Sequence, residues 1–247
     1  MADWPAAVVL AGITKSFDGF SVLRGLDLSI APGSVTALLG PSGCGKTTAL
    51  RIVAGLEDAD AGTVEIGGVV AAGPGVNVPT EQRRVGMIFQ NGALFPHLSV
   101  AHHVGYGLAR ADRKDGPRIS EMLELVGLAG FGDRRPDSLS GGQAQRVALA
   151  RALAPAPAVV LMDEPFSNLD AVLRARLRRE VGDVVRAAGV TVLLVTHDPV
   201  SYTHLRAHET VLDLVCRLLL EKKNTTHSSH NLLLHFTTPY HTLPPDH

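Results

Sequence analysis

The sequence contains little cysteine, almost no net charge and no long apolar run. Its 247 residues include only two cysteines, Cys44 and Cys216, so neither a disulfide framework nor a metal cluster is expected, and the chain suits a reducing cytosol. The formal net charge of −1 gives no basic excess that would favour a nucleic-acid partner. No apolar run approaches the roughly 20 residues of a transmembrane helix. With 45% hydrophobic residues, the chain can instead bury one or two cores.

A strand, a loop and a helix are predicted in direct succession within residues 35–55, which read VTALLGPSGCGKTTALRIVAG. The loop matches the pattern G-x-x-x-x-G-K-[ST], in which glycines let backbone N–H groups surround phosphate oxygens. The start of the helix favours an anion as well, because its N–H groups are unpaired. We expect Lys46 to reach the β- and γ-phosphates of a nucleotide, and Thr47 to place its hydroxyl on Mg²⁺. The residues expected to bind the nucleotide here are Gly40, Pro41, Ser42, Gly43, Cys44, Gly45, Lys46, Thr47 and Thr48.

The N-terminal part predicts an antiparallel arrangement of short strands between residues 8 and 30. Asp18 and Gly19 form a hairpin signal between two strand patterns. Phe17 lies directly before this turn, and an aromatic ring there could stack on a nucleotide base, since every base offers a π-face. The alternative for Phe17 is a core phenylalanine.

Two further strands, at residues 84–89 and 158–162, are predicted to deliver polar residues to the carboxyl edge of a sheet, where α/β proteins bind ligands. Gln90 follows the first strand, and its amide could coordinate Mg²⁺ or water, although a lone glutamine is usually only a surface residue. Asp163 follows the second strand and can bind Mg²⁺ through water. The next residue, Glu164, is placed to polarise an attacking water or accept its proton. The alternative for these two carboxylates is an N-cap pair before a helix.

A mainly helical segment is expected between residues 98 and 151, because helical apolar periods replace the strand patterns there. Within it, residues 139–143 read LSGGQ and lead directly into a strongly helix-forming stretch. Two glycines at a helix start again expose N–H groups to an anion. A single compact site has little use for a second phosphate-binding helix start. We therefore expect the second one to bind the nucleotide of another subunit through Ser140, Gly141, Gly142 and Gln143.

A last helix and strand are predicted after the sequence SNLD at residues 167–170. Residues 190–195 read as a buried strand, which would bring His197 to the same edge as the carboxylates. A histidine there could donate to a γ-phosphate oxygen, whereas alone it would more often be structural. Three arginines of the preceding helix are interpreted as a solvated face rather than a binding patch: Arg174, Arg178 and Arg179.

Taken together, these motifs closely resemble the ATP-binding subunit of an ABC transporter over about residues 6–198. Walker A is GPSGCGKT, the signature is LSGGQ, Walker B ends in Asp163 and Glu164, and the D-loop is SNLD. The resemblance implies an α/β fold with a RecA-like P-loop NTPase core, an antiparallel β-subdomain and a helical insertion at about residues 91–152. It implies ATP and Mg²⁺ as cofactors. The residues that would be catalytic by this resemblance are Glu164, the switch histidine His197, the Q-loop residue Gln90 and Lys46, and those that would hold the metal are Thr47, Gln90 and Asp163.

The resemblance also implies partners. Two such domains would form a homodimer with two ATP molecules, each held between Walker A of one copy and the signature of the other. The dimer would lie at the cytoplasmic face of the inner membrane, where ATP hydrolysis would drive two transmembrane permease subunits. A substrate-binding protein would deliver the substrate to these permease subunits. Residues 78–100, VPTEQRRVGMIFQNGALFPHLSV, are most similar to bacterial importers for ferric iron, polyamines and sulfate, and ferric iron is our first choice. No nucleic-acid partner is expected.

Few positions depart from the family pattern. Phe17 stands where many members have tyrosine, Ala144 where glutamine is frequent, and His102 with His103 replaces a commoner acidic and polar pair. The alternative functions are an ABC ATPase of translation or DNA repair, which would normally carry two cassettes or a long coiled coil, and another P-loop enzyme such as a kinase, which would have no use for LSGGQ. An inactive fragment is the third alternative.

The third alternative comes from residues 199–247, which we predict to be a non-native tail, so that the nucleotide-binding domain is residues 1–198, truncated after the switch histidine. None of the 25 glycines lies after Gly189, whereas seven of the eleven histidines lie after residue 199. Residues 200–210, VSYTHLRAHET, are similar to the translation of a transposase-end sequencing adapter, and residues 213–223 resemble its remainder running into poly-A. The other interpretation is a C-terminal helix with a histidine-rich metal-binding tail.

Overall fold

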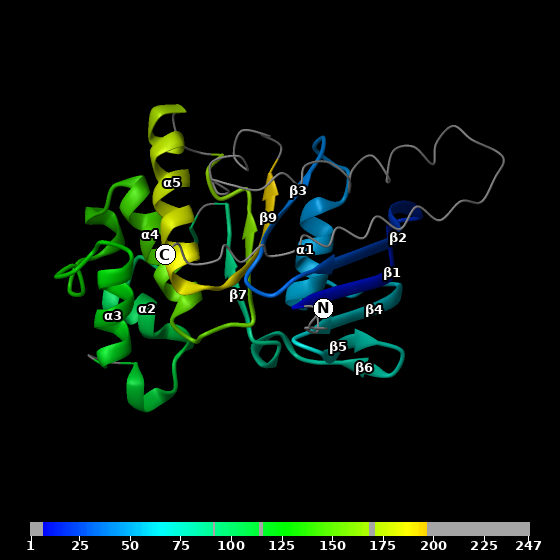
Figure 1. Ribbon diagram of the computed structural model, residues 1–247, viewed down its shortest axis with the longest axis horizontal. Coiled ribbons are helices and arrows are strands. Elements are labelled where there is room, and N and C mark those ends of the chain that lie inside the picture. The colour runs from blue at the N-terminus through cyan, green and yellow to red at the C-terminus, as the bar shows by residue number, and fades with distance from the viewer. Residues whose placement is uncertain (1–6, 91, 114–115, 168–170, 197–247) are drawn as a thin grey trace, which may run out of the picture.

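The computed structural model describes residues 7–90, 92–113, 116–167 and 171–196. These form two sheets and a layer of helices (Figure 1). The antiparallel sheet has the order β2-β1-β4-β5-β6, and its strands are β1 (Val8–Phe17), β2 (Phe20–Ile30), β4 (Ala61–Ile66), β5 (Val69–Gly73) and β6 (Val76–Asn77). The parallel sheet has the order β3-β9-β8-β7, and its strands are β3 (Val35–Leu39), β7 (Val85–Ile88), β8 (Val159–Asp163) and β9 (Thr191–Thr196). The α-helices are α1 (Lys46–Ala54), α2 (Val100–Val104), α3 (Pro117–Leu125), α4 (Gly141–Leu153) and α5 (Ala171–Ala188).

The hairpin between β1 and β2 forms at the predicted turn. Asp18 and Gly19 both have positive φ, at 49° and 78°, which is the backbone of the two-residue turns whose twist matches paired strands. Phe17 therefore pairs directly with Phe20 across the turn. Farther along, the register places Lys15 opposite Leu23. Instead of several short strands, residues 8–30 form two long ones, whose pairing continues to Val8 and Ile30.

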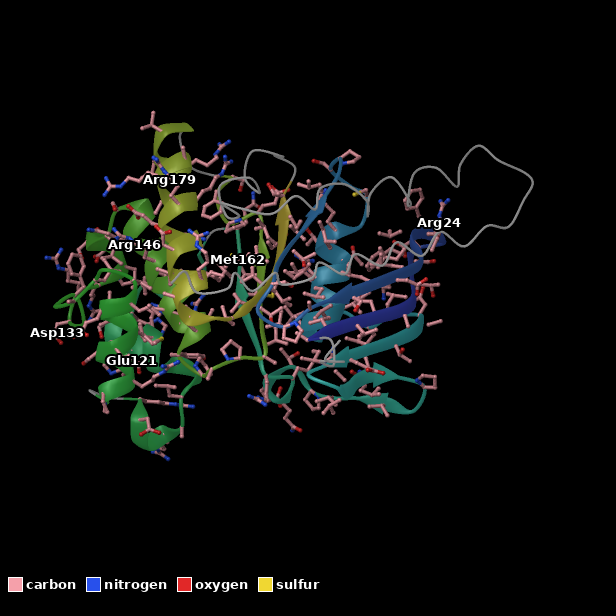
Figure 2. The ribbon with its side chains drawn as sticks, viewed as in Figure 1. Arg24, Glu121, Asp133, Arg146, Met162 and Arg179 are labelled. Carbon is pink, nitrogen blue, oxygen red and sulfur yellow. The ribbon has the colours of Figure 1, made fainter. Side chains whose placement is uncertain are left out.

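Strand β8 lies in the middle of the parallel sheet and is buried on both faces. Val159 and Leu161 face one hydrophobic cluster, whereas Val160 and Met162 face the other, as the alternation of side chains along a strand requires. The first cluster also contains the apolar side chains of α1 and those of the antiparallel sheet, so α1 lies between the two sheets (Figure 1). Figure 2 shows Met162 near the centre of the molecule, with Arg24 and Asp133 toward opposite ends.

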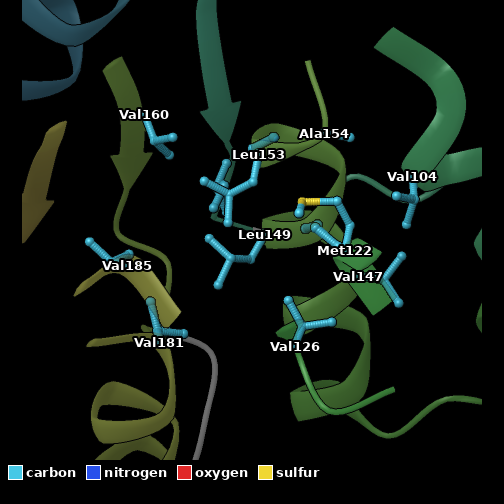
Figure 3. Packing of buried hydrophobic residues seen from close by; sticks show 14 of the residues in the cluster. Val104, Met122, Val126, Val147, Leu149, Leu153, Ala154, Val160, Val181 and Val185 are labelled. Carbon is cyan, nitrogen blue, oxygen red and sulfur yellow. The ribbon is translucent and has the colours of Figure 1, made fainter. Parts of the chain in front are cut away.

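The second cluster joins the other face of the parallel sheet to the helical layer (Figure 3). Helix α4 is its central element, with side chains of β8 and α5 on one side and of α2 and α3 on the other. Val147, Leu149 and Leu153 of α4 are at most 4% exposed. The predicted helical segment is thus confirmed, and α4 connects it to the core.

One sequence interpretation was wrong. Arg178 was assigned to a solvated face, yet it is buried, while Arg179 is exposed as expected. Residue 178 lies three positions before Val181 and seven before Val185, both buried, so the helical repeat places it beside the apolar stripe of α5. Among the helices in the described part of the chain, none has both the length and the apolar character that a membrane crossing requires.

Candidate functional site

The phosphate loop connects β3 to α1, as the sequence predicted. Gly45 is the N-cap of α1 with φ of 98°, a backbone conformation that favours glycine. A Cβ at this position would lie 2.8 Å from Cδ2 of Leu23 on β2, so the loop packs closely against the antiparallel sheet. At the other end, Gly55 closes the helix with φ of 76°, and its N–H bonds to the last carbonyls. Residues 41–43 are exposed, and Gly40, Cys44, Thr47 and Thr48 are half-buried.

Lys46 is only 6% exposed and points back over the loop that precedes it. Its Nζ donates hydrogen bonds to the carbonyl oxygens of Gly40 at 2.7 Å and Pro41 at 2.8 Å, and lies 3.7 Å from Sγ of Cys44. These contacts curl the loop around the ammonium group. Phosphate oxygens would be stronger partners than neutral carbonyls, because both sides of the bond would then be charged.

Thr47 and Asp163 bring the start of α1 to the end of β8. The Thr47 hydroxyl donates to Oδ1 of Asp163 over 2.9 Å. A hydroxyl and a carboxylate at this separation fit Mg²⁺, which commonly takes one or two carboxylates and completes its shell with phosphate oxygens and water. No group of three or more His, Cys, Asp or Glu side chains able to hold a metal occurs among the described residues. Thr47 and Asp163 are two described residues here that could hold Mg²⁺ together with a nucleotide's phosphates.

Glu164 directly follows Asp163 and has φ of 44°, an uncommon backbone conformation for a residue with a side chain. Its N–H donates to the carbonyl of Val195 on β9 at 3.0 Å, and its own carbonyl accepts from the N–H and hydroxyl of Ser167. Such unusual conformations persist where the surroundings fix them, often at functional sites. The N-cap alternative for the carboxylates is wrong, because the next helix begins only at Ala171.

Gln90 lies at the same edge of the parallel sheet as the carboxylates. Ile88 of β7 pairs with Met162 of β8. Gln90 lies two residues after Ile88, and Glu164 lies two residues after Met162, so both follow the strands at the same level. Gln90 is exposed. The loop that follows it is held by Arg151 of α4, whose guanidinium donates to the carbonyls of Ala93 at 2.7 Å and Gly92 at 2.9 Å. Sequence reasoning missed this contact of Arg151, which spans 58 residues and has no local signal.

Phe17 ends β1 and is 41% exposed, so the core alternative for this residue is wrong. The ammonium of Lys15 lies 4.9 Å from the ring centroid. Lys15 also forms an ion pair with Glu57, at 2.6 Å, and lies 3.7 Å from a carboxylate oxygen of Asp60. None of these three charged residues was singled out from the sequence, because they belong to two segments that only the fold brings together.

The LSGGQ sequence forms the start of α4. Ser140 is its N-cap, and a capping box joins it to Gln143: the Gln143 N–H donates to Oγ of Ser140, and the Ser140 N–H donates to Oε1 of Gln143. Ser140 and Gly141 are exposed. Gly142 is buried, and a Cβ there would lie 3.3 Å from the methyl groups of Leu177 on α5.

The two helix starts lie on different sides of the parallel sheet. Helix α1 belongs to the cluster shared with the antiparallel sheet, whereas α4 belongs to the cluster on the other face (Figure 1). The predicted switch residue His197 lies outside the described residues, which end at Thr196 of β9.

Comparisons with known proteins agree with this arrangement. The family model described as "ABC transporter" matches residues 23–167. The chain is 55% identical over 193 residues to the Fe(3+) ions import ATP-binding protein FbpC 3 of Rhodococcus jostii (strain RHA1), covering 78% of this chain and 55% of that protein. It is 50% identical over 190 residues to the Fe(3+) ions import ATP-binding protein FbpC of Mesorhizobium japonicum (strain LMG 29417 / CECT 9101 / MAFF 303099), covering 76% and 53%. The chain thus spans about half the length of the curated relatives it matches.

A solved structure supports the same assignment. The cbiO1 protein of Clostridium perfringens, described as part of the ABC transporter complex cbiONQ, superposes with a TM-score of 0.68 at 26% identity, covering 78% of this chain and 79% of that one. The predicted architecture, a P-loop NTPase core with an antiparallel subdomain and a helical insertion, is confirmed. The chain belongs to the ABC transporter family.

Proposed function

We propose that this chain binds ATP with Mg²⁺ and hydrolyses it. The observation that carries the proposal is the convergence of Lys46, Thr47, Asp163 and Glu164 at the end of β8 and the start of α1. Lys46 would bind the β- and γ-phosphates, and Thr47 with Asp163 would hold Mg²⁺, which neutralises charge on the phosphates when bound. Membership of the ABC transporter family supports ATP as the nucleotide.

Glu164 would act as the general base that orients the attacking water and accepts its proton. Its position supports this role, since the backbone bond to Val195 fixes the residue at the carboxyl edge of the sheet beside the phosphate loop. Gln90, at the same edge, would bind Mg²⁺ or the water. His197 would donate a hydrogen bond to the γ-phosphate, and Phe17 would stack on the base.

We propose further that two copies form composite ATP sites. The separation of the two anion-binding helix starts supports this: α1 and α4 pack on opposite faces of one sheet, so a nucleotide at α1 is not shared with α4 of the same copy. The exposed Ser140 and Gly141 would instead bind the γ-phosphate of the partner's ATP, with Gln143 holding the helix start in its capping box.

The proposed cellular role is the ATPase subunit of an importer, most simply for ferric iron. The names of the relatives from Rhodococcus jostii and Mesorhizobium japonicum support iron, and the cbiONQ complex of the structural neighbour supports a multi-subunit assembly. The partners would be two permease subunits and a substrate-binding protein, at the cytoplasmic face of the inner membrane. The nucleotide-binding domain would be residues 1–198, with its helical insertion at about 91–152.

The test compares ATP binding with hydrolysis in the full chain. Glu164→Gln keeps the shape of the side chain but cannot take a proton, so it should bind ATP with a Kd within about threefold of wild type and hydrolyse it at least about a hundredfold more slowly. Lys46→Ala should lose binding as well. Glu81→Gln is the matched control, because Glu81 is exposed and its neighbour Thr80 bonds to Gly55, at the end of α1 opposite the phosphate loop. Hydrolysis by Glu164→Gln at a rate within about threefold of wild type would overturn the proposed base.

A further inference from the structure

Lys15 occupies an unusual position at the end of β1. Its side chain is only 12% exposed, whereas most lysines are largely exposed unless they are paired. The ammonium forms the 2.6 Å ion pair with Glu57 and lies over the ring of Phe17, 4.9 Å from its centroid. The hydrogen bond to Glu57 raises the pKa of Lys15 against the opposing effect of desolvation, so the group stays charged at neutral pH.

Asp60 forms hydrogen bonds with the backbone of β1 on both sides of Lys15. Its Oδ2 accepts a hydrogen bond from the N–H of Ser16 at 2.6 Å, and its own N–H donates to the carbonyl of Thr14 at 2.9 Å. Oδ1 of Asp60 faces the Lys15 ammonium at 3.7 Å. The pairing of β1 with β4 ends at Thr14 and Ala61. Beyond that point, the Asp60 side chain instead of a β4 carbonyl accepts the hydrogen bond from the β1 backbone. The backbone on both sides of Lys15 is thereby fixed.

This arrangement connects Phe17 to the phosphate loop by two routes. Glu57 and Asp60 lie in the connection that leaves the C-terminal end of α1, whose other end is the phosphate loop. On β2, Leu23 pairs with Lys15 and packs against Gly45 of that loop. Phe20, the partner of Phe17, is three residues from Leu23, or about 10 Å along an extended strand. A nucleoside could span this distance.

We propose that Lys15, anchored by Glu57 and Asp60, is a positioning residue that fixes the Phe17 ring as a platform for the base, and so sets the affinity for the nucleoside rather than for the triphosphate. The inference rests on the proposed function, in which Phe17 stacks on the base. The Lys15 ammonium lies over one face of the ring of Phe17, a residue that is 41% exposed, and the base would stack on the other face. Lys15 itself would not bind phosphate, because Glu57 and Asp60 already neutralise it.

The experiment compares two ligands that differ in the nucleoside. Calorimetry on the full chain measures the Kd of adenylyl imidodiphosphate, which is not hydrolysed at the β–γ bridge, and of inorganic tripolyphosphate. Lys15→Gln should weaken the first by about three- to tenfold, the scale of one cation–π contact and its ion pair, and change the second by less than about twofold. Asp60→Asn should act in the same direction. Lys15→Arg, which keeps the charge, should restore binding of the nucleotide analogue.

Two controls separate the possible failures. Arg176→Gln removes an exposed ion pair with Glu180 on α5 and should change neither Kd. Phe17→Leu tests the platform itself: it should weaken the analogue alone, and Lys15→Gln should add no further loss in that background. If Phe17→Leu weakens the analogue but Lys15→Gln does not, or if Lys15→Gln weakens both ligands equally, the inference fails and the proposed function stands. If Phe17→Leu has no effect, the base platform is wrong and the inference fails with it.

Discussion

The hydroxyl of Thr47 donates a 2.9 Å hydrogen bond to the carboxylate of Asp163, a residue 116 positions away along the chain. The bond joins the first turn of α1 to the carboxyl end of β8, although β3, the strand that precedes the phosphate loop, is separated from β8 by β9 in the sheet. Two groups suited to Mg²⁺ are thus held together by the fold itself. In the proposed Mg²⁺ site, these two side chains would need little rearrangement when a nucleotide binds.

This relationship predicts a change in metal dependence without a large change in stability. In Asp163→Asn the amide oxygen can still accept from Thr47, but the negative charge is lost. We expect hydrolysis to need at least about tenfold more Mg²⁺, the scale of losing one metal-binding group. The free energy of unfolding should change by about 1 kcal/mol or less, because the hydrogen bond remains. Phosphate release measured over a Mg²⁺ titration, with denaturant unfolding in parallel, checks both expectations.

The matched control is Asp133→Asn, an exposed carboxylate in the helical layer. It should leave the Mg²⁺ titration unchanged. A wild-type Mg²⁺ dependence in Asp163→Asn would show that this carboxylate does not hold the metal.

Much of the fold was predictable because its signals are local. The phosphate loop, the Asp18–Gly19 turn and the apolar run of β8 each specify a conformation within a few neighbouring residues, and all three form as expected. The placement of Gln90, Asp163 and Glu164 at one edge also followed, because parallel strands end on the same side of a sheet. The burial of Arg178 did not follow from the sequence, since a charged residue beside an apolar stripe can lie on either side of the boundary between the buried and the exposed face of a helix.

The supporting contacts of the site were not predictable for a related reason. Lys15 with Asp60, and Arg151 with Ala93, join segments that are 45 and 58 residues apart. No pattern in either segment specifies its partner. Such long-range pairs depend on how α1 and α4 pack against their sheets, and that packing is settled only in the folded chain.

The composite-site proposal predicts complementation between two inactive variants. Ser140→Arg places a long cation at the exposed start of α4 and should block the partner's nucleotide, whereas Lys46→Ala should lose its own nucleotide. Each variant alone should fail to dimerise with ATP. A mixture retains one intact Lys46 and one intact Ser140 facing each other, so ATP-dependent heterodimers should reappear on size exclusion.

Arg179→Ser, an exposed position on α5, serves as the control and should dimerise with ATP as wild type does. A hydrolysis rate per molecule that does not depend on protein concentration, in a chain that stays monomeric, would contradict the composite site.

His103 predicts a loss of stability in mild acid. It is fully buried on α2, stacks against Phe95 with ring centroids 5.8 Å apart, and its Nε2 contacts the Phe95 carbonyl at 3.0 Å. Burial lowers the pKa of His103 below its ordinary value, while the Phe95 carbonyl opposes this and the charges of Arg151, His97 and His102 add to it. The unfolded chain therefore binds this proton more readily than the folded chain.

The contribution of neutral His103 is fully present above the unfolded pKa of about 6.5 and is lost as the pH falls toward the lower folded value. Relative to His103→Asn, which cannot titrate in this range, wild type should lose unfolding free energy between pH 7 and about pH 5. Denaturant unfolding at several pH values measures the difference, and Arg179→Ser, an exposed position on α5 that does not act on the pKa of His103, is the control. A difference that is constant with pH would mean that His103 keeps its ordinary pKa.

Residues 199–247 lie outside the described residues, and we propose that they are not native sequence. Two separate blocks resemble the translation of one transposase-end adapter: VSYTHLRAHET is similar to its first part, and DLVCRLLLEKK resembles the remainder running into poly-A. The two residues between them, Val211 and Leu212, leave room for an index of the usual size. Independent chance matches at both blocks with this spacing would be improbable, whereas one read through an adapter produces them together.

Amplifying the genomic locus with primers inside residues 35–196 and sequencing it without transposase-based libraries decides the matter. We expect the native frame to leave the present sequence near residue 199 and to continue with apolar strand and helix patterns. Those elements would cover β3, which lies at an edge of the parallel sheet in the described residues. Recovery of codons for SYTHLRAHET from native DNA would contradict the proposal, and residues 199–247 would then have to be explained as a histidine-rich segment of the protein itself.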